Sequence, residues 1–468
     1  ENVRAEFFIR QFMDFPADGE AVATLGPGES AELPLSVLLN GEVFELEEDR
    51  LLQSQIVVRY EQGGEAHEFS RVQPVTLYKR TALSWDDSGK LAAFIMPNEE
   101  TISRFARRVA EPGEAVSEFS ISEKFFRAAK IADAVGTFGI NYIEDPESPF
   151  TAVHGEAEVV DTVSFPRTTL LYRAGDCDDT TALLGSLYEA AGIKTAIMTS
   201  PGHVFMAFDT EEPEQNSWMF EVEGFRTITY NGSVWIPVET TILQEGFWRA
   251  WEEASRLIIR HQEDGDIEFL PVAEQRISFP PLPLPPATTE IVEPADPLIA
   301  SLFGSTIDAM SRGMYDARLA TLEDEFASAR GRRRMGYFNR IGILHARFGR
   351  FDLAEETFRD AIEEDEDYVS SYINLANLLL DGDRFDEALA VLEEGYDKRP
   401  RSVLVNLLLT RVYYELGEPV EGTEYFALVS DRAPALAERY SYMVERDSTA
   451  RASGADVSIP FIWPTEEE

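Results

Sequence analysis

The stretch of sequence that decides the fold of the central region is Arg173-Ala-Gly-Asp-Cys177-Asp-Asp-Thr-Thr-Ala-Leu-Leu-Gly-Ser-Leu-Tyr-Glu-Ala-Ala-Gly192. Apolar residues recur at helical spacing after the cysteine, and glycine is typical of the position just past a helix. We therefore predict a helix that begins at or just after Cys177 and closes at Gly192. Backbone N–H groups and the positive end of the dipole at a helix N-terminus favour a thiolate, which predicts a lowered pKa for this thiol.

Two further segments place a base and an acid downstream of the cysteine. His203 follows Ser200-Pro-Gly and opens an alternating pattern typical of a strand, and Glu239 ends the strand-like run Ser233-Val-Trp-Ile-Pro-Val. A thiol at a helix tip can then face an imidazole on one strand, which a carboxylate on the next strand orients. Cys177 is the only cysteine of the chain, and without these partners it would be interpreted as a small buried apolar residue.

These motifs resemble those of the transglutaminase-like (papain-like) cysteine superfamily, and the Gly-Asp-Cys-Asp-Asp run is similar to that of its bacterial members. The resemblance covers roughly residues 120–245. It implies an α+β core in which Cys177 is the nucleophile, His203 the base and Glu239 the acid that orients the imidazole. The usual residue at the third position is Asp, and Asp209 is the alternative orienter.

The resemblance implies a cysteine hydrolase or acyltransferase that acts on protein amide bonds, and we favour hydrolysis. The alternative function is a catalytically inactive transglutaminase-like scaffold in an extracytoplasmic protein assembly. A bacterial relationship also predicts a periplasmic or otherwise extracytoplasmic location, after removal of a targeting segment that does not precede Glu1 in this numbering.

Three carboxylates, those of Asp176, Asp178 and Asp179, flank the cysteine. We interpret them first as caps for the N-terminal turn of the helix. Alternatively they hold Ca²⁺, a hard cation that prefers carboxylate oxygens. Their charge also raises the pKa of a nearby thiol and so opposes the helix dipole. We expect no cofactor to be required, and one cysteine without a second thiol or a paired histidine argues against zinc.

The regions on either side have different patterns. Residues 1–95 contain short alternating runs separated by glycine-rich turns, which predicts an all-β, immunoglobulin-like sandwich. The pattern becomes helical at residue 96, and we assign the transglutaminase-like domain to residues 96–265. Residues 266–296 contain Phe279-Pro-Pro-Leu-Pro-Leu-Pro-Pro and predict a stiff, proline-rich linker.

The remainder predicts an all-α domain at residues 297–450 with an internal period of 34 residues. The copies lie at 335–368, 369–402 and 403–436, and they resemble tetratricopeptide repeats. This resemblance implies stacked helix pairs with a groove for a protein partner. The tail, residues 451–468, includes Ile459-Pro-Phe-Ile-Trp-Pro464, which is apolar enough to dock either on its own repeats or on a partner.

The charge of the chain excludes one class of partner. There are 85 Asp and Glu against 41 Lys and Arg, which gives a formal net charge of -44. A nucleic-acid-binding protein needs a basic stripe to neutralise phosphates, so we expect no nucleic-acid partner. No run of 18 apolar residues occurs, so we expect no membrane span.

Overall fold

The structure is a computed structural model of the chain and describes residues 1–111, 113, 116, 119, 121–143, 160–282, 284, 291–444 and 463–464. Most of the predicted tail and the centre of the predicted linker lie outside these residues. The chain divides into two compact units. One comprises Glu1–Ala110, Lys130–Phe208 and Pro237–Ile299, and the other Glu111–Ala129, Asp209–Ile236 and Ala300–Glu468.

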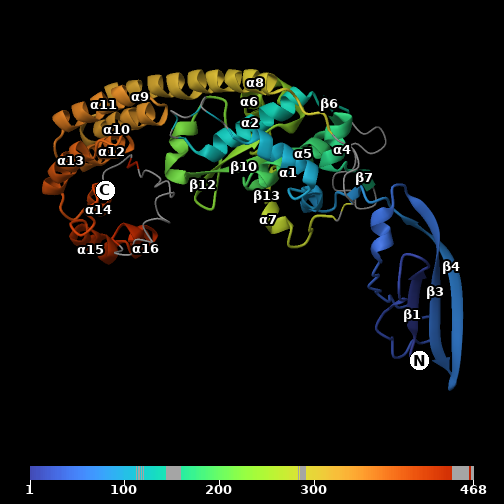
Figure 1. Cartoon of the computed structure of the whole chain (residues 1–468). Coiled ribbons are helices and arrows are strands. Elements are labelled where there is room, and N and C mark those ends of the chain that lie inside the picture. The colour runs from blue at the N-terminus through green and yellow to red at the C-terminus, as the bar shows by residue number, and fades with distance from the viewer. Residues whose placement is uncertain are drawn as a thin grey trace. The chain divides into compact units, whose positions relative to one another are not determined.

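The N-terminal region is β-rich, as predicted. Its sheet has the order β2-β1-β3-β4 and is antiparallel, with strands β1 (Arg4–Ile9), β2 (Ala17–Asp18), β3 (Arg50–Gln62) and β4 (Glu65–Leu77) (Figure 1). Gly63 and Gly64 join the two long strands with φ angles of 65° and 85°, the left-handed conformation of a tight hairpin. An immunoglobulin-like sandwich has two packed sheets, whereas the described residues 1–77 form one, so that finer assignment stays a prediction.

The central helix of the first unit is α5 (Cys177–Ala190), which contacts α1 (Glu100–Val109) and α4 (Pro166–Tyr172). Its residues from Cys177 to Tyr188 are all buried. A Cβ on Gly185 would lie 2.6 Å from the Met206 side chain, so the glycine lets α5 approach strand β10 closely. The helix ends as predicted, because Gly192 has a φ of 75° and its N–H bonds back to Glu189 O.

The central sheet has the order β11-β12-β10-β9-β13. Its strands are β9 (Thr195–Ser200), β10 (His203–Pro213), β11 (Ile228–Tyr230), β12 (Ser233–Val238) and β13 (Glu268–Pro271). Strand β13 pairs antiparallel with β9, Glu268 opposite Thr199, and helix α7 (Val272–Gln275) follows it. The predicted linker 266–296 therefore begins too early, because its first residues complete the sheet.

Smaller elements surround this sheet. Strand β5 (Ala82–Ser84) pairs with β7 (Val160–Thr162), and β6 (Asn141–Tyr142) pairs with β8 (Ala174–Gly175). The described residues of the region also form η1 (Gly41–Glu45), η2 (Ser88–Phe94), α2 (Glu123–Phe138), η4 (Glu214–Phe220), η5 (Thr240–Glu245) and α6 (Phe247–His261).

The C-terminal part of the chain is a series of helices, drawn in yellow to red in Figure 1, in which each helix from α9 to α16 contacts the next. Gly342 lies against the ring of Phe358, where a Cβ would come within 2.4 Å, so the first helix pair packs closely. Among the described residues, no helix is long and apolar enough to cross a membrane. The elements are α8 (Asp296–Met310), the π-helix η6 (Ser311–Asp316), α9 (Ala317–Ser328), α10 (Gly331–Arg347), α11 (Phe351–Glu364), α12 (Val369–Asp381), α13 (Phe385–Lys398), α14 (Val403–Glu415), α15 (Thr423–Arg432), α16 (Pro434–Tyr440) and η7 (Ser441–Met443).

Candidate functional site

Cys177 is the first residue of α5 and is 3 % exposed. The backbone N–H of Val204 acts on the thiol and lowers its pKa. Val204 follows His203 at the start of β10, which pairs with β9 through His203 and Ser200. The structure therefore brings the thiol beside the first residues of the strand that carries the predicted base.

The environment of the thiol differs from the prediction. Burial raises the pKa of Cys177 well above 9.0, and the negative charges of Asp178 and Asp176 raise it further. The Val204 N–H lowers the pKa but does not offset these effects. The expected lowering of the pKa by the helix N-terminus is therefore wrong, because desolvation and two carboxylates outweigh the dipole. The resting residue is a neutral thiol.

His203 and Glu239 form the predicted pair. His203 Nε2 lies 2.6 Å from Glu239 Oε2, and the two side chains are 22 % and 4 % exposed. Within the described part of the chain, the other ring nitrogen, Nδ1, has no hydrogen-bond partner. This leaves Nδ1 for an external proton donor or acceptor.

Glu239 is held as a carboxylate. Burial raises its pKa, but the hydrogen bond and charge of His203, together with two hydrogen bonds from Thr241, outweigh burial and lower the pKa below 4.5. Thr241 donates its N–H to Oε1 at 3.0 Å and its hydroxyl to the same oxygen at 2.6 Å. A fixed, ionised carboxylate is what an orienter of an imidazole requires.

A cluster of threonine hydroxyls links the segment that carries this carboxylate to helix α5. The hydroxyl of Thr240, next to Glu239, lies 3.0 Å from that of Thr180 and 3.1 Å from that of Thr181. Thr180 also donates to the carbonyl of Asp176 at 2.7 Å. These buried contacts fix the start of η5 against the first turn of α5.

Asp209, the alternative orienter, is engaged elsewhere. It is 4 % exposed, and its Oδ1 accepts hydrogen bonds from the Ser233 hydroxyl and, at 2.8 Å, from Glu211 N–H. His203 pairs with Glu239 instead. The geometry therefore favours Glu239 as the orienter.

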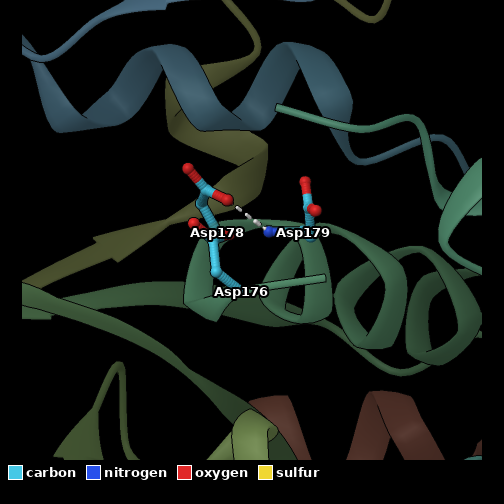
Figure 2. Close-up of side chains that lie close together, drawn as sticks. All are labelled: Asp176, Asp178 and Asp179. Carbon is cyan, nitrogen blue, oxygen red and sulfur yellow. Dashed lines mark hydrogen bonds between the residues drawn. The ribbon is translucent and has the colours of Figure 1, made fainter. Parts of the chain in front are cut away.

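The three carboxylates at the start of α5 lie within 4.8 Å of one another and are all buried (Figure 2). Asp178 Oδ1 accepts the Asp179 N–H at 2.6 Å, and Asp179 Oδ1 accepts the Ser164 N–H at 2.5 Å. Asp176 is the N-cap residue, but its side chain makes no capping hydrogen bond. The capping interpretation thus holds for Asp178 at most.

A proton or a cation is needed among these carboxylates. Burial raises the pKa of Asp178, and the neighbouring carboxylate of Asp176 raises it further, which favours a protonated Asp178. Asp176 Oδ1 and Asp178 Oδ2 are buried with no hydrogen-bond partner among the described residues. Clustered carboxylate oxygens are also the ligands that Ca²⁺ prefers, so the residues fit the predicted cation.

Replacing Asp179 with asparagine should stabilise the metal-free protein at high pH. Burial raises the pKa of Asp179 to about 7 from 3.8. The folded state then binds more protons than the unfolded state between these values, so wild-type stability falls as the pH rises from about 4 to about 7. Asparagine does not titrate and can still accept from Ser164. We expect the free energy of unfolding of the variant to exceed that of the wild type by about 2–4 kcal/mol at pH 8 and to equal it near pH 4. Thermal unfolding in EDTA measures this difference.

Calcium distinguishes the two interpretations of the cluster. If the carboxylates bind Ca²⁺, millimolar Ca²⁺ at pH 8 should raise the wild-type melting temperature and leave D179N little changed. Equal shifts in both proteins would assign the carboxylates to the helix alone. A stability gain of D179N that is the same at pH 4 and pH 8 would contradict the raised pKa.

The helical stack is the part of the chain with a match to a known family. Residues 339–403 and 373–437 match the tetratricopeptide repeat. No curated protein matches the chain significantly. The match covers most of the first predicted copy and all of the second and third, so the repeat prediction is confirmed there, whereas the transglutaminase-like resemblance has no such support.

The sequence did not indicate the residues that hold the predicted triad in place. Thr180-Thr181 and Thr240-Thr241 are visible as doublets, but no spacing rule pairs doublets that lie 60 residues apart. Asp161 adds a fourth buried negative charge near Asp178 and accepts the Trp85 indole N–H at 2.7 Å. Only the fold brings it to this site.

Proposed function

We propose that the central region, assigned from the sequence to residues 96–265, is a transglutaminase-like cysteine hydrolase or acyltransferase that acts on protein amide bonds. The observation that carries the proposal is the His203–Glu239 pair, 2.6 Å apart, with His203 next in sequence to Val204, whose backbone N–H acts on the Cys177 thiol. The order of nucleophile, base and acid is that of a catalytic triad.

In this reaction the thiol is activated only when substrate is present. His203 Nδ1 accepts the Cys177 proton as the sulfur attacks the amide carbonyl, and backbone N–H groups at the tip of α5 hold the oxyanion. The C–N bond breaks, the imidazolium returns the proton to the leaving amine, and Glu239 keeps the ring oriented. Water or a second amine then releases the acyl group from sulfur. We favour water.

The remaining domains fit a protein substrate. Tetratricopeptide repeats suggest protein–protein interaction. We propose that the groove of these repeats recruits a protein partner and that residues 1–95, assigned as immunoglobulin-like, act as an accessory module. A periplasmic or other extracytoplasmic location belongs to the same proposal, and fractionation of cells that express the protein would test it.

A second candidate function is an inactive scaffold. The observation that favours it is the burial of Cys177, because a residue that is 3 % exposed needs movement of the surrounding side chains before a peptide can reach its thiol. Its pKa is also raised by burial and by Asp178 and Asp176. In a scaffold, the domain would dock partners without turnover.

A thiol-directed peptide probe distinguishes these functions. An acyloxymethyl ketone carrying a short peptide should label the full chain at one site, and Cys177→Ser should abolish the labelling. Because Cys177 is the only cysteine, mass spectrometry of the intact protein reports occupancy directly.

Non-peptidic iodoacetamide serves as the comparison reagent. A peptide probe that reacts no faster than iodoacetamide, together with an unhydrolysed peptide library, would leave the scaffold as the function. Partner capture that survives Cys177→Ser would agree with that outcome.

A further inference from the structure

The repeat stack contains a polar site on the first helices of two adjoining repeats. Asn339 on α10 and Asn374 on α12 are both fully buried. Each donates its side-chain N–H to one backbone oxygen, that of Pro464, at 2.6 Å and 3.1 Å. Residues 125 and 90 positions away in sequence thus meet at one carbonyl of the C-terminal tail.

An aromatic contact accompanies these hydrogen bonds. Trp463 is 5 % exposed, and its ring lies nearly parallel to that of Phe358 on α11, 19° apart with centroids separated by 6.2 Å. A buried tryptophan supplies a large apolar contact, of the kind that dominates peptide interfaces. Proline at the next position has no N–H group, so its burial leaves no donor unsatisfied.

We propose that this site is a groove for an extended segment that presents a Trp-Pro pair, and that the chain's own Trp463-Pro464 occupies it as a self-ligand. The inference rests on the proposed partner-binding role of the repeats and is independent of the chemistry at Cys177. The occupant of the site is part of the same chain. A partner peptide gains access to the site only by displacing it.

Two features support a ligand that a partner can displace. They are its covalent link to the repeats and the side-chain oxygens of the two asparagines. Residues 445–462 join the last described helical turn to Trp463, and 18 residues reach up to about 60 Å when extended. A ligand carried by the same chain acts at an effective concentration near the millimolar range, which favours its contact over that of a peptide in dilute solution. Asn339 Oδ1 and Asn374 Oδ1, however, are buried without a donor among the described residues. A partner that adds N–H donors there would bind better than the tail.

The test is competition at the groove. A fluorescent peptide of residues 455–468 is titrated into the full chain, into a chain that ends at residue 450, and into full-length Trp463→Ala. Emptying the groove should increase the affinity for the peptide at least about tenfold in both variants. The point variant covers the case in which truncation disturbs folding, which circular dichroism checks.

Single substitutions in the repeats and in the peptide identify the residues that take part in peptide binding. In the shortened chain, Asn339→Ala and Asn374→Ala should each weaken peptide binding about three- to tenfold, and a peptide with alanine for Trp463 should bind at least about thirtyfold more weakly. Phe351→Ala, at a residue that is 40 % exposed, should have no effect.

Three outcomes would overturn the proposal. The first is equal affinity of the full and shortened chains for the peptide. The second is that the shortened chain binds the tail peptide and the peptide with alanine for Trp463 with equal affinity. The third is a concentration-dependent dimer of the full chain that the shortened chain lacks, because the tail would then serve a second copy. If no tail peptide binds but other extended peptides do, the proposal that the tail is a self-ligand is wrong. The proposed recruitment of a partner by the repeats is then unaffected.

Discussion

Replacing His203 with alanine is expected to slow alkylation of Cys177 by the peptide probe by about 10²–10⁴-fold, the contribution of a positioned general base. The physical reason is the resting state of the thiol. Burial and the charges of Asp178 and Asp176 raise its pKa, so almost no thiolate is present at neutral pH. Attack therefore depends on proton transfer to the imidazole. Stopped-flow or mass-spectrometric labelling rates at pH 7 measure the effect.

The pH profile separates a lost base from a disturbed fold. Without His203 the labelling rate should still be rising above pH 9, since only the thiolate that forms by direct ionisation reacts. Added imidazole should restore part of the rate at pH 7. His261→Ala, at the end of α6, is the matched control and should leave labelling unchanged. If H203A labels as fast as the wild type at pH 7, the triad is not the catalytic unit.

Several parts of the fold follow from local sequence signals. The start of α5 at Cys177 and its end before Gly192 were predictable, because helical periodicity and a C-terminal glycine are short-range features. The period of 34 residues likewise identified the tetratricopeptide repeats. By contrast, the mostly apolar segment Trp218-Met-Phe-Glu-Val222 predicts a strand, whereas Glu214–Phe220 form the 3-10 helix η4. Trp218, Met219 and Phe220 are all buried, and a short apolar run does not distinguish a strand from a helix.

The site was predictable only as a set of residue types. His203 and Glu239 could be named from their place at strand ends, and they do pair. Burial could not be read from the motif, and burial decides the pKa of Cys177. The helix tip alone predicts a thiolate. The three-dimensional environment reverses that prediction because desolvation acts on the whole side chain, whereas the dipole contributes through a few N–H groups.

The acidity of the chain has a local consequence that composition did not indicate. With twice as many acids as bases, carboxylates are expected on a solvated surface. Glu212 on β10 is nevertheless 4 % exposed, and the structure pairs it with Arg347, which is 6 % exposed, at the end of α10. Glu212 also accepts the Ser122 N–H at 2.8 Å and the Asn216 side-chain N–H at 2.9 Å. Both residues belong to the same compact unit.

Replacing Glu212 with glutamine is therefore expected to destabilise this unit by about 3–5 kcal/mol, because the Arg347 charge would stay buried without its partner. Glutamine has nearly the same size and retains one acceptor, so packing changes little. For a unit of this size the melting temperature should fall by roughly 10 °C. Differential scanning calorimetry of the full chain measures the shift.

A double variant decides whether the loss comes from the unpaired charge. Glu212→Gln with Arg347→Met removes both charges, and it should be more stable than Glu212→Gln alone, because an apolar side chain tolerates the buried position. Glu366→Gln, which breaks an exposed pair with Lys398, should change stability by less than about 1 kcal/mol. If the double variant is as unstable as the sum of its single changes, the two residues act independently. The stability would then come from the hydrogen bonds of Glu212 to Ser122 and Asn216 rather than from its charge.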